Sequence, residues 1–315
     1  MFEMRASLQA LTAELKRLKA SGVKSLSVSD ESMKALRAVV AARAKGAPAA
    51  APAKESSVPA IAPPEIAEAV ARVREPAPEF AAKPAAPGGP PVPEPAPFDL
   101  PEGDKPSRWA SLRERVLRDA VCCARVRPGK QVVFGVGNLD AKIMFVGEAP
   151  GGEEEVQGEP FVGPAGQLLT KMITGMGLAR SDVYIGNIMN WRPEMPLDAG
   201  GVQYGNRPPT AQEMAYCLPY LKAQVRVVDP DVLVALGATA AQALLGPGSF
   251  KALGEVRGRW HEFAGKPMMV TYHPSYILRN QSNRSKRLIW EDLLKVMEKV
   301  GLPISEKQRG FFLER

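Results

Sequence analysis

Four apolar runs in the C-terminal two thirds of the chain each precede a stretch with helical periodicity. The runs occupy residues 143–146, 183–188, 232–236 and 268–271. Continuous apolar strands of this length are typical of a parallel sheet that is buried on both faces. The alternation therefore predicts an α/β fold with a three-layer α/β/α architecture around a central, four-stranded, mostly parallel sheet.

The helices between these strands have recognisable starts. Pro164 opens one helix, and Thr210 begins the next, which runs to about residue 228. Two more helices are predicted at residues 238–245 and 285–300. In a sheet of this kind, ligands bind outside the carboxyl ends of the strands. The residues that follow each strand are therefore the first candidates for a functional site.

The first third of the chain follows different patterns. Leucines recur every three or four residues from Leu8 to Leu18, which predicts an amphipathic helix, and a second helix is predicted after Ser29 or Asp30. More than half of the 30 prolines lie between residues 46 and 106, where little apolar surface can be buried. The predicted organisation is a small N-terminal helical segment (1–45), a Pro/Ala-rich disordered linker (46–106), a catalytic domain (107–302) and a C-terminal tail (303–315). The N-terminal helices form either a small appendage, which we favour, or a module that docks an unknown protein.

Charge and cysteine content narrow the possible functions. The 315-residue chain carries a formal net charge of +7, with the excess in the block after residue 106. This charge favours either a polyanionic partner or a mildly basic surface without specific function. Three cysteines are too few for a disulfide framework and suit a reducing cytosol. We find no secretion signal and no stretch long enough to span a membrane, so we expect a cytoplasmic monomer without a membrane partner.

Polar residues follow three of the four predicted strands. Glu148 follows the first strand, Asn187 ends the second, and His273 follows the last. Each has an ordinary structural explanation on its own, such as a helix cap or a turn hydrogen bond. Together they deliver a carboxylate, an amide and an imidazole to one edge of the sheet. Phe161, in the loop that carries Glu148, adds a flat apolar face, so the set suits a flat heterocycle.

Two segments of opposite charge flank this predicted site. The loop GEAPGGEEEVQGEPFVGPAG is acidic and lacks the pattern of a phosphate-binding loop, so it indicates a nucleobase or a sugar cation. The stretch HPSYILRNQSNRSKR is basic and resembles a phosphate-contacting surface, the alternative being a basic helix entry near solvent. Its candidate DNA-binding residues are Arg279, Arg284, Lys286 and Arg287. Residues 276–278, Tyr-Ile-Leu, form a candidate apolar wedge for a base stack.

Three motifs occur in a recognisable order: GEAPGGEEEVQGEPFVGPAGQLL, YIGNIMNWRP and YHPSYILRN. Together they resemble the uracil-DNA glycosylase superfamily, most closely family 4, over about residues 121–300. The resemblance implies an enzyme that flips deoxyuridine out of DNA and hydrolyses its N-glycosidic bond, leaving an abasic site for base excision repair. By motif, Phe161 would stack on uracil, Asn187 would read its Watson–Crick edge, and His273 would bond its oxygen.

The resemblance also implies roles for the residues around this group. Glu148 would sit beside the base, and Glu154 would place or activate water. The remaining expected pocket residues are Gly147, Ala149 and Ser275. Ala149 stands where the best-known glycosylase family carries a catalytic aspartate, so this chain must depend on the other groups.

Two departures from family 4 change the expectations. The family normally binds a four-iron, four-sulfur cluster through four cysteines, but only Cys123 and Cys217 match, with Asp119 and Trp191 at the other two positions. Two thiolates do not make a conventional cluster, and Cys122 cannot restore the spacing, so we expect no cofactor and no metal. The second departure is the insert EMPLDAGGVQYGNR at residues 194–207. Neither histidine of the chain, His261 or His273, lies in it, which disfavours the covalent trapping of uracil-DNA seen in one relative of the family.

Two alternative functions stay open at this point. One is a glycosylase broadened to deaminated purines, and the other is a catalytically inactive sensor of uracil or single-stranded DNA. The whole set of expected site residues is present, namely Glu148, Glu154, Phe161, Asn187 and His273. This argues against the sensor, because a protein that only binds DNA does not need carboxylates that position water. The sequence does not distinguish single-stranded from double-stranded substrates.

Overall fold

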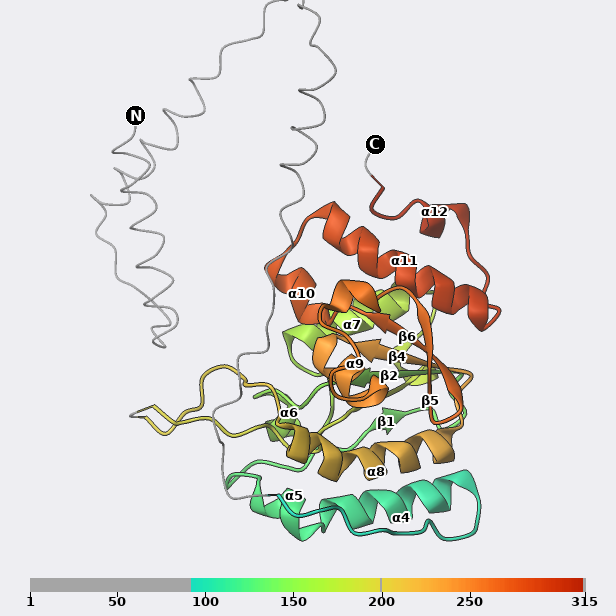
Figure 1. Cartoon of the computed structure of the whole chain (residues 1–315). Helices are drawn as coiled ribbons and strands as arrows, with labels where there is room; N and C mark the ends of the chain where they lie inside the picture. Colours follow the sequence, from blue (N-terminus) through green and yellow to red (C-terminus); the bar gives the residue numbers. More distant parts are fainter. Residues whose placement is uncertain (1–91, 199, 314–315) are drawn as a thin grey trace, which may run out of the picture. The chain divides into compact units, whose positions relative to one another are not determined.

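The sheet of the computed structural model has six strands in the order β1-β3-β2-β4-β6-β5 (Figure 1). The structure describes residues 92–198 and 200–313, so the predicted N-terminal helices and most of the predicted linker lie outside the described residues. Its four inner strands run parallel and are β3 (Tyr184–Asn187), β2 (Ile143–Gly147), β4 (Val232–Leu236) and β6 (Lys266–Thr271). They correspond to the four apolar runs, and the predicted α/β class is confirmed.

Two antiparallel edge strands were not predicted. β1 (Val136–Gly137) is only two residues long and pairs with β3, so it leaves no periodic signal in the sequence. β5 (Trp260–Phe263) pairs with β6 across a tight turn at Ala264 and Gly265, whose φ angles are 53° and 76°. Positive φ at both central residues is the geometry of a two-residue hairpin. The sheet therefore has six strands, with the four expected ones at its centre.

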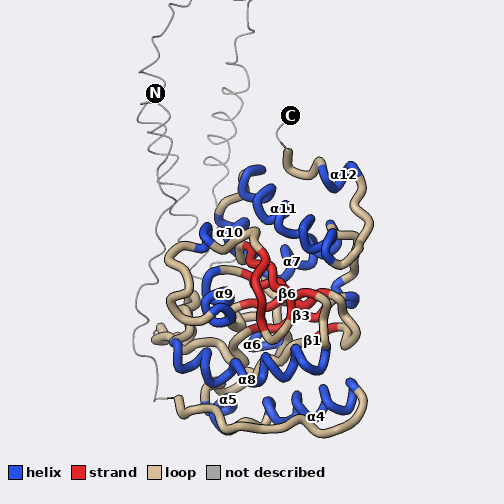
Figure 2. The backbone as a smooth tube through the Cα atoms, turned by 45° about the vertical axis from the view of Figure 1, so that its right-hand side comes forward, coloured by secondary structure: helices blue, strands red, loops and turns tan. Residues whose placement is uncertain are grey.

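Helices cover both faces of the sheet (Figure 2). The main helices are α4 (Lys105–Leu117), α5 (Ala120–Ala124), α7 (Pro164–Gly175), α8 (Ala211–Val228), α9 (Ala238–Leu245), α10 (Pro274–Arg279) and α11 (Asn283–Lys299). The shorter ones are α6 (Glu154–Gln157), α12 (Glu306–Arg309) and the 3-10 turns η1 (Arg180–Asp182) and η2 (Leu253–Glu255). On one face α7, α10 and α11 share a core with the sheet, and on the other α8 and α9 do so. α4 packs on the outside of α8 and adds a further layer.

The predicted helix boundaries agree closely with the structure. Thr210 caps α8 through its side chain, which accepts a hydrogen bond from the backbone N–H of Glu213, as the sequence indicated. The helix predicted at 238–245 has those bounds. The last helix begins two residues earlier than expected, because the side chain of Ser282 caps it.

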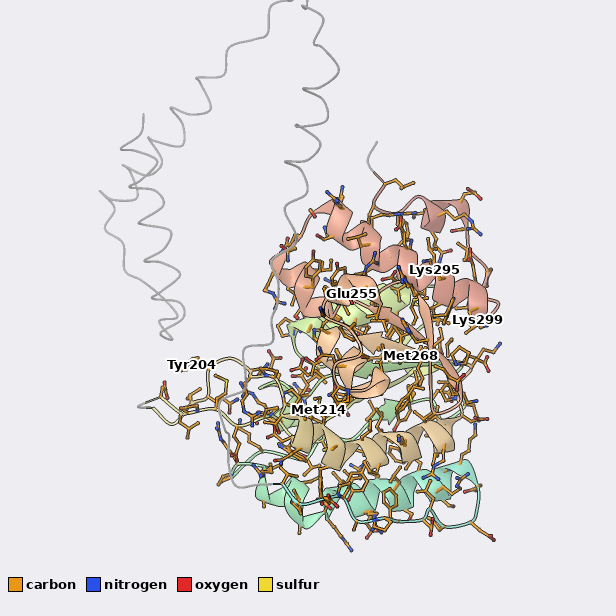
Figure 3. All side chains as sticks on the ribbon, viewed as in Figure 1. Tyr204, Met214, Glu255, Met268, Lys295 and Lys299 are labelled. Atoms are coloured by element: carbon orange, nitrogen blue, oxygen red, sulfur yellow. The ribbon has the colours of Figure 1, made fainter. Side chains whose placement is uncertain are left out.

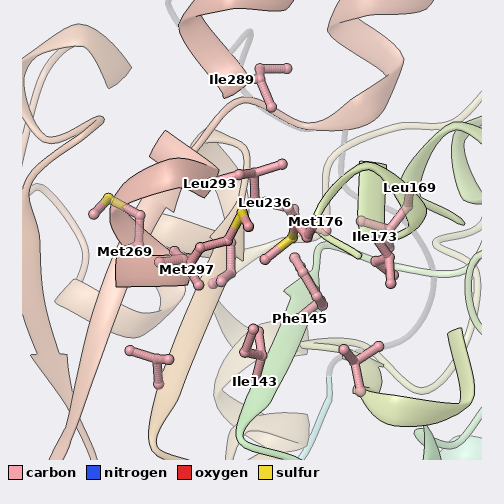
Figure 4. Packing of buried hydrophobic residues seen from close by; sticks show 14 of the residues in the cluster. Ile143, Phe145, Leu169, Ile173, Met176, Leu236, Met269, Ile289, Leu293 and Met297 are labelled. Carbon is pink, nitrogen blue, oxygen red and sulfur yellow. The ribbon is translucent and has the colours of Figure 1, made fainter. Parts of the chain in front are cut away.

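The core between the sheet and α11 is made of long apolar side chains. Figure 4 shows Phe145, Leu236 and Met269 from three neighbouring strands facing Leu293 and Met297 of α11. All five side chains are almost completely buried. Burial of this kind stabilises the fold by roughly 1.5–3 kcal/mol per large apolar side chain, and it gives the ends of the strands a rigid support.

Segments on both sides of the predicted catalytic domain also pack on it. The ring centroid of Phe98, in the region assigned to the linker, lies 5.2 Å from that of Tyr220 of α8. Val92 and Leu100 contact the same apolar cluster, so the folded part begins before residue 107. In the predicted tail, Gln308 accepts a hydrogen bond from Trp290 Nε1 at 2.6 Å through its backbone carbonyl. No helix in the described part of the chain has the length and apolar character of a membrane span.

Candidate active site

The carboxyl ends of β2 and β3 bring three of the predicted pocket residues together. Gly147 and Asn187 are register partners in adjacent parallel strands. A Cβ atom added at Gly147 would collide with Asn187 Oδ1 and would lie 2.5 Å from Phe161 Cζ. Only a glycine therefore fits between the amide and the ring. The structure thus places Gly147, Phe161 and Asn187 in one contact group.

Glu154 organises the loop that carries Phe161. Its Oε1 accepts hydrogen bonds from the backbone N–H groups of Val162 at 3.0 Å and Gly163 at 2.9 Å, and its Oε2 accepts one from Gly151 at 3.1 Å. Three bonds from backbone donors use both oxygens of this buried carboxylate. Glu154 therefore closes the acidic loop on itself, and its expected role in placing or activating water stays a prediction.

Phe161 is held in an unusual backbone conformation. Its φ is 55°, in the left-handed region that bulky residues rarely adopt. The following helix allows this conformation, because a Cβ at Gly166 would collide with the Phe161 carbonyl group. The ring is 6% exposed and lies 5.6 Å from the His273 ring, at an interplanar angle of 31°. Local strain of this kind is common where a side chain is held for a ligand.

Asn187 carries an unsatisfied polar atom into this contact group. The residue is 6% exposed, and its Oδ1 has no hydrogen-bond partner among the described residues. A buried acceptor without a partner costs roughly 1–3 kcal/mol. The Oδ1 atom of Asn187 therefore has its full capacity to accept a hydrogen bond from a bound molecule.

His273 is fixed in one neutral form. The backbone N–H of Ser275 donates to His273 Nδ1 at 3.2 Å, and the Ser275 hydroxyl lies 2.9 Å from the same nitrogen. Because Nδ1 accepts, the proton of the neutral ring resides on Nε2. Burial, reinforced by the charge of Arg279, lowers the pKa of His273 to about 4. At neutral pH the ring is an uncharged hydrogen-bond donor.

Glu148 adds a partly buried carboxyl group at the end of β2. Burial raises the pKa of Glu148, and a hydrogen bond with Thr239 of α9 opposes part of this rise. A carboxylate with a raised pKa is a stronger base toward water. Ala149, the next residue, is partly buried and contacts the cluster that contains Trp191, so it lines the loop without contributing a functional group.

The predicted DNA-binding residues divide into two groups. Arg279 and Arg284 are exposed, and Lys286 is partly exposed. In contrast, Arg287 donates from Nε to Glu291 and from its guanidinium to the backbone carbonyls of Arg309 and Phe311, at 2.7 and 2.9 Å. Arg287 therefore fixes the C-terminal segment, and its expected role in DNA binding stays a prediction.

The three candidate wedge residues differ in their packing and exposure. The Tyr276 ring stacks on Tyr272 at 4.3 Å, and Ile277 is buried in the core. Leu278 is 42% exposed. Leu278 is thus the only one of the three whose side chain is free to enter a base stack.

The sequence of this domain is similar to those of proteins with known activity. The family model described as the uracil DNA glycosylase superfamily matches residues 134–294, about half of the chain. The type-4 uracil-DNA glycosylase of Thermotoga maritima is 43% identical over 185 residues, which cover 58% of this chain and 90% of that protein. The chain belongs to the uracil-DNA glycosylase superfamily. The type-4 enzyme of Archaeoglobus fulgidus is 37% identical over 206 residues (62% and 96%), and the type-5 enzyme of Pyrobaculum aerophilum is 31% identical over 187 (52% and 73%).

Two of the four positions at which the family-4 resemblance implies cluster cysteines carry other residues, Asp119 and Trp191. Asp119 caps α5 and accepts hydrogen bonds from Cys122 N at 2.7 Å and from the hydroxyls of Tyr216 and Tyr220 at 2.8 Å each. The side chain of Trp191 is completely buried, with its ring 6.3 Å from that of Tyr216. A carboxylate in three hydrogen bonds and an indole fill two of the four positions.

The cysteines near these positions do not restore a cluster site. Cys123, which matches a cluster position by motif, is exposed, and its thiol donates to the Leu117 carbonyl at 3.2 Å. Instead, Cys122 lies inside beside Cys217, and the hydrogen bond between these thiols together with burial raises the pKa of Cys122. The described residues contain no group of three or more potential ligands that could hold a metal. The residues present therefore do not fit a four-cysteine cluster.

Sequence reasoning missed several residues that shape the site. Arg180 donates to the Pro160 carbonyl at 2.6 Å and so supports the loop just before Phe161. Arg192 forms an ion pair with Glu155 at 2.9 Å, which fixes the other end of the same loop. Both residues are far in sequence from the atoms they bind, so no local pattern indicates these contacts.

Proposed function

We propose that this chain is a monofunctional uracil-DNA glycosylase, which flips deoxyuridine out of DNA and hydrolyses its N-glycosidic bond. The observation that carries the proposal is the unpaired, buried Oδ1 of Asn187 beside the ring of Phe161. An acceptor in the pocket wall and an aromatic face next to it suit a flat pyrimidine that is stacked on one face and bonded along one edge.

Base selection follows from the hydrogen-bonding pattern of the amide. Uracil presents an N3–H donor next to the O4 acceptor, and an Asn amide presents an acceptor next to a donor. Cytosine presents an acceptor at N3 and an amino donor at C4, so Asn187 Oδ1 would face another acceptor. A buried polar group left unpaired rejects the wrong base strongly. Asn187 is therefore the proposed selective residue.

Hydrolysis develops opposite charges on the base and on the sugar. As the C1′–N1 bond breaks, its electron pair leaves with uracil, and positive charge develops on the deoxyribose. The neutral His273 donates from Nε2 to the uracil oxygen and so stabilises the departing anion. Glu148, with its raised pKa, orients water toward C1′ and takes up the proton that the water loses. The water oxygen stays on C1′, which leaves an abasic site.

Glu154 has a positioning role in this proposal. Its three backbone hydrogen bonds hold the loop in which Phe161 faces the base. The acidic loop therefore serves the reaction in two ways: Glu148 faces the sugar and its water, and Glu154 keeps the aromatic platform in place.

We further propose that catalysis by this chain does not use an iron–sulfur cluster. The support is the chemistry at the four positions of the family's cluster cysteines, where Asp119 accepts hydrogen bonds from two tyrosines, Trp191 is buried and the Cys123 thiol is at the surface. A cytosolic setting suits the three free thiols, and we propose uracil-containing DNA as the partner of a monomeric enzyme.

A single-turnover assay tests the proposed function. Oligonucleotides carrying one uracil, hypoxanthine or xanthine are incubated with excess protein and then treated with alkali to cleave abasic sites. Cleavage at uracil supports the proposal, and comparable cleavage at either purine would show a broadened glycosylase. Binding without cleavage at any base would contradict the proposal and favour a sensor.

A further inference from the structure

The described residues of the insert, 194–198 and 200–207, form a loop with its own hydrogen bonds. The Asp198 side chain accepts from the backbone N–H of Val202 at 2.7 Å, and the Asp198 N–H donates to the Val202 carbonyl at 3.0 Å. Gln203 is buried and ties the two arms together, donating to the Pro193 carbonyl and accepting from the Met195 N–H. A loop with this many internal bonds presents its outer side chains in defined positions.

Those outer side chains are apolar. Leu197, Val202 and Tyr204 are 48%, 48% and 61% exposed, among the most exposed large hydrophobic residues of the described chain. Val202 and Tyr204 flank the buried Gln203, and in an extended segment residues two apart point to the same side. Figure 3 shows Tyr204 on the loop that projects beyond the body of the domain. The loop therefore displays an aromatic ring with aliphatic neighbours to solvent.

The base of this insert loop is attached to the acidic loop of the active site. Arg192 donates to Asn206 Oδ1 at 2.8 Å and to the Gly205 carbonyl at 2.7 Å, while its other nitrogen pairs with Glu155 at 2.9 Å. Glu155 directly follows Glu154. One arginine thus links the insert loop to the segment that positions Phe161.

We propose that the insert loop is a second DNA-binding element, in which the Tyr204 ring stacks on an unpaired base adjacent to the flipped uracil. This inference rests on the proposed function, and it extends the DNA surface beyond α10 and the start of α11. Stacking suits the loop because every base has a π-face, so one exposed ring can hold a strand without reading its sequence.

A protein partner fits these residues less well. A stable protein interface buries roughly 800 Å² on each partner, and three apolar side chains on a narrow loop supply only a small part of that area. A single base, in contrast, is covered by one aromatic ring. The loop is also attached through Arg192 and Glu155 to the segment that carries Phe161, the ring that we propose to stack on uracil.

The test compares Tyr204→Ala with Tyr204→Phe on single-stranded oligonucleotides that contain one uracil. We expect Tyr204→Ala to raise the half-saturating DNA concentration about 10-fold, with the maximal single-turnover rate unchanged within about twofold. The matched control Tyr204→Phe keeps the ring and should behave as the wild type. On fully paired duplexes the effect of Tyr204→Ala should be smaller, because the neighbouring bases stay stacked. An unchanged half-saturating concentration on single strands would overturn the proposal.

A second measurement does not depend on catalysis. Fluorescence of the Tyr204→Trp variant is recorded during titration with a single-stranded oligonucleotide that carries one uracil, with the wild type as control for the native tryptophans. Stacking on bases should quench the added fluorescence. The DNA concentration needed for half of the quenching should rise with salt concentration, as it does for DNA binding. Quenching without uracil excision would leave the inference standing and refute only the proposed function. Excision without quenching would refute the inference and leave a protein-docking loop as the better explanation.

Discussion

The Oδ1 atom of Asn187 and the ring of Phe161 both lie against the α carbon of Gly147, at a point where no Cβ atom fits. The two side chains come from different segments, one at the end of β3 and the other in the loop before α7. The strand pairing of Gly147 with Asn187 sets their separation. The geometry of the proposed uracil pocket therefore depends on a residue without a side chain.

This relationship predicts the effect of Gly147→Ala. The added methyl group would displace Asn187 or Phe161, and a misplacement of about 1 Å can reduce a rate by about 100-fold. We expect uracil excision to fall by about that factor under single-turnover conditions. Gly254→Ala is the matched control, because a Cβ there meets no atom within 4 Å. Equal rates for the Gly147→Ala variant and the wild type would contradict the pocket geometry.

Replacing Glu148 or Glu154 by glutamine should impair different properties, the excision rate in the first case and the order of the Phe161 loop in the second. Glu148→Gln removes the base that takes the proton of water, so the single-turnover rate should fall by about 100- to 10,000-fold with DNA affinity nearly unchanged. Glu154→Gln replaces one acceptor oxygen by a donor that faces backbone N–H groups. Amide hydrogen exchange at Val162 and Gly163 should therefore accelerate in the Glu154→Gln variant only. Acceleration in both variants, or in neither, would refute this division of roles.

The pH profile of excision should not report the titration of His273. Its pKa is lowered to about 4 by burial and by Arg279, so the ring stays neutral and able to donate from Nε2 throughout the neutral range. We expect the rate to show no inflection near the ordinary histidine pKa of about 6.5. His273→Ala should lower the rate by about 100-fold at every pH in that range. A wild-type inflection near 6.5 that disappears in His273→Ala would contradict the assigned neutral form.

Stability at low pH should depend on Asp119. Burial alone would raise the pKa of Asp119, but hydrogen bonds from Cys122, Tyr216 and Tyr220 outweigh it and lower the pKa below its ordinary value of 3.8. A carboxyl group with a lowered native pKa stabilises the fold above its unfolded pKa, and this contribution is lost as the pH falls through the native value.

Urea unfolding of the wild type and of Asp119→Asn tests this contribution. The substitution keeps an oxygen for the α5 cap but replaces the oxygen that accepts from both tyrosine hydroxyls by an amide group, so we expect a loss of about 1–3 kcal/mol in the free energy of unfolding near pH 7. The difference between the two proteins should shrink as the pH falls below 3.8 and through the lowered native pKa of Asp119. A constant difference across this range would show that the charge of Asp119 is not the stabilising feature.

Charge reversal should distinguish Arg284, a proposed DNA contact, from Arg287, which fixes the C-terminal segment. Arg284→Glu should weaken DNA binding and reduce the slope of log affinity against log salt concentration by about one or more. Arg287→Glu should instead release the C-terminal segment, because Arg287 bonds the carbonyls of Arg309 and Phe311. Its main effect should be on thermal stability. Equal salt slopes for Arg284→Glu and the wild type would remove Arg284 from the DNA surface.

Much of this fold and site could be predicted from the sequence because the signals are local. Continuous apolar runs gave the four inner strands, and caps such as Thr210 gave the helix starts. Because parallel strands end at one edge of the sheet, the sequence predicted that Glu148, Asn187 and His273 share that edge. The expected roles of the site residues came from the motif resemblance. Strand order alone does not show whether an aromatic ring stacks on a ligand or packs in the core.

The features that were missed depend on long-range contacts. The two oxygens of Glu154 are used by backbone donors that only the folded loop brings near. In the sequence, Arg287 resembles an exposed cation, because its contact with the distant C-terminal segment exists only in the folded protein. Cys122, rather than Cys123, faces Cys217 because the short helix α5 turns the first thiol inward. Motif spacing does not determine which of two adjacent side chains is buried.

The central claim is tested most directly by single-turnover excision with a matched pair, the wild type and Asn187→Ala, on an oligonucleotide carrying one uracil. The iron content of the same wild-type sample is measured in parallel. We predict cleavage at uracil by iron-free wild-type protein and a rate about 100-fold or more lower for Asn187→Ala. Wild-type protein that binds the oligonucleotide without cleaving it, or cleaves it equally well without the Asn187 amide, would contradict this account.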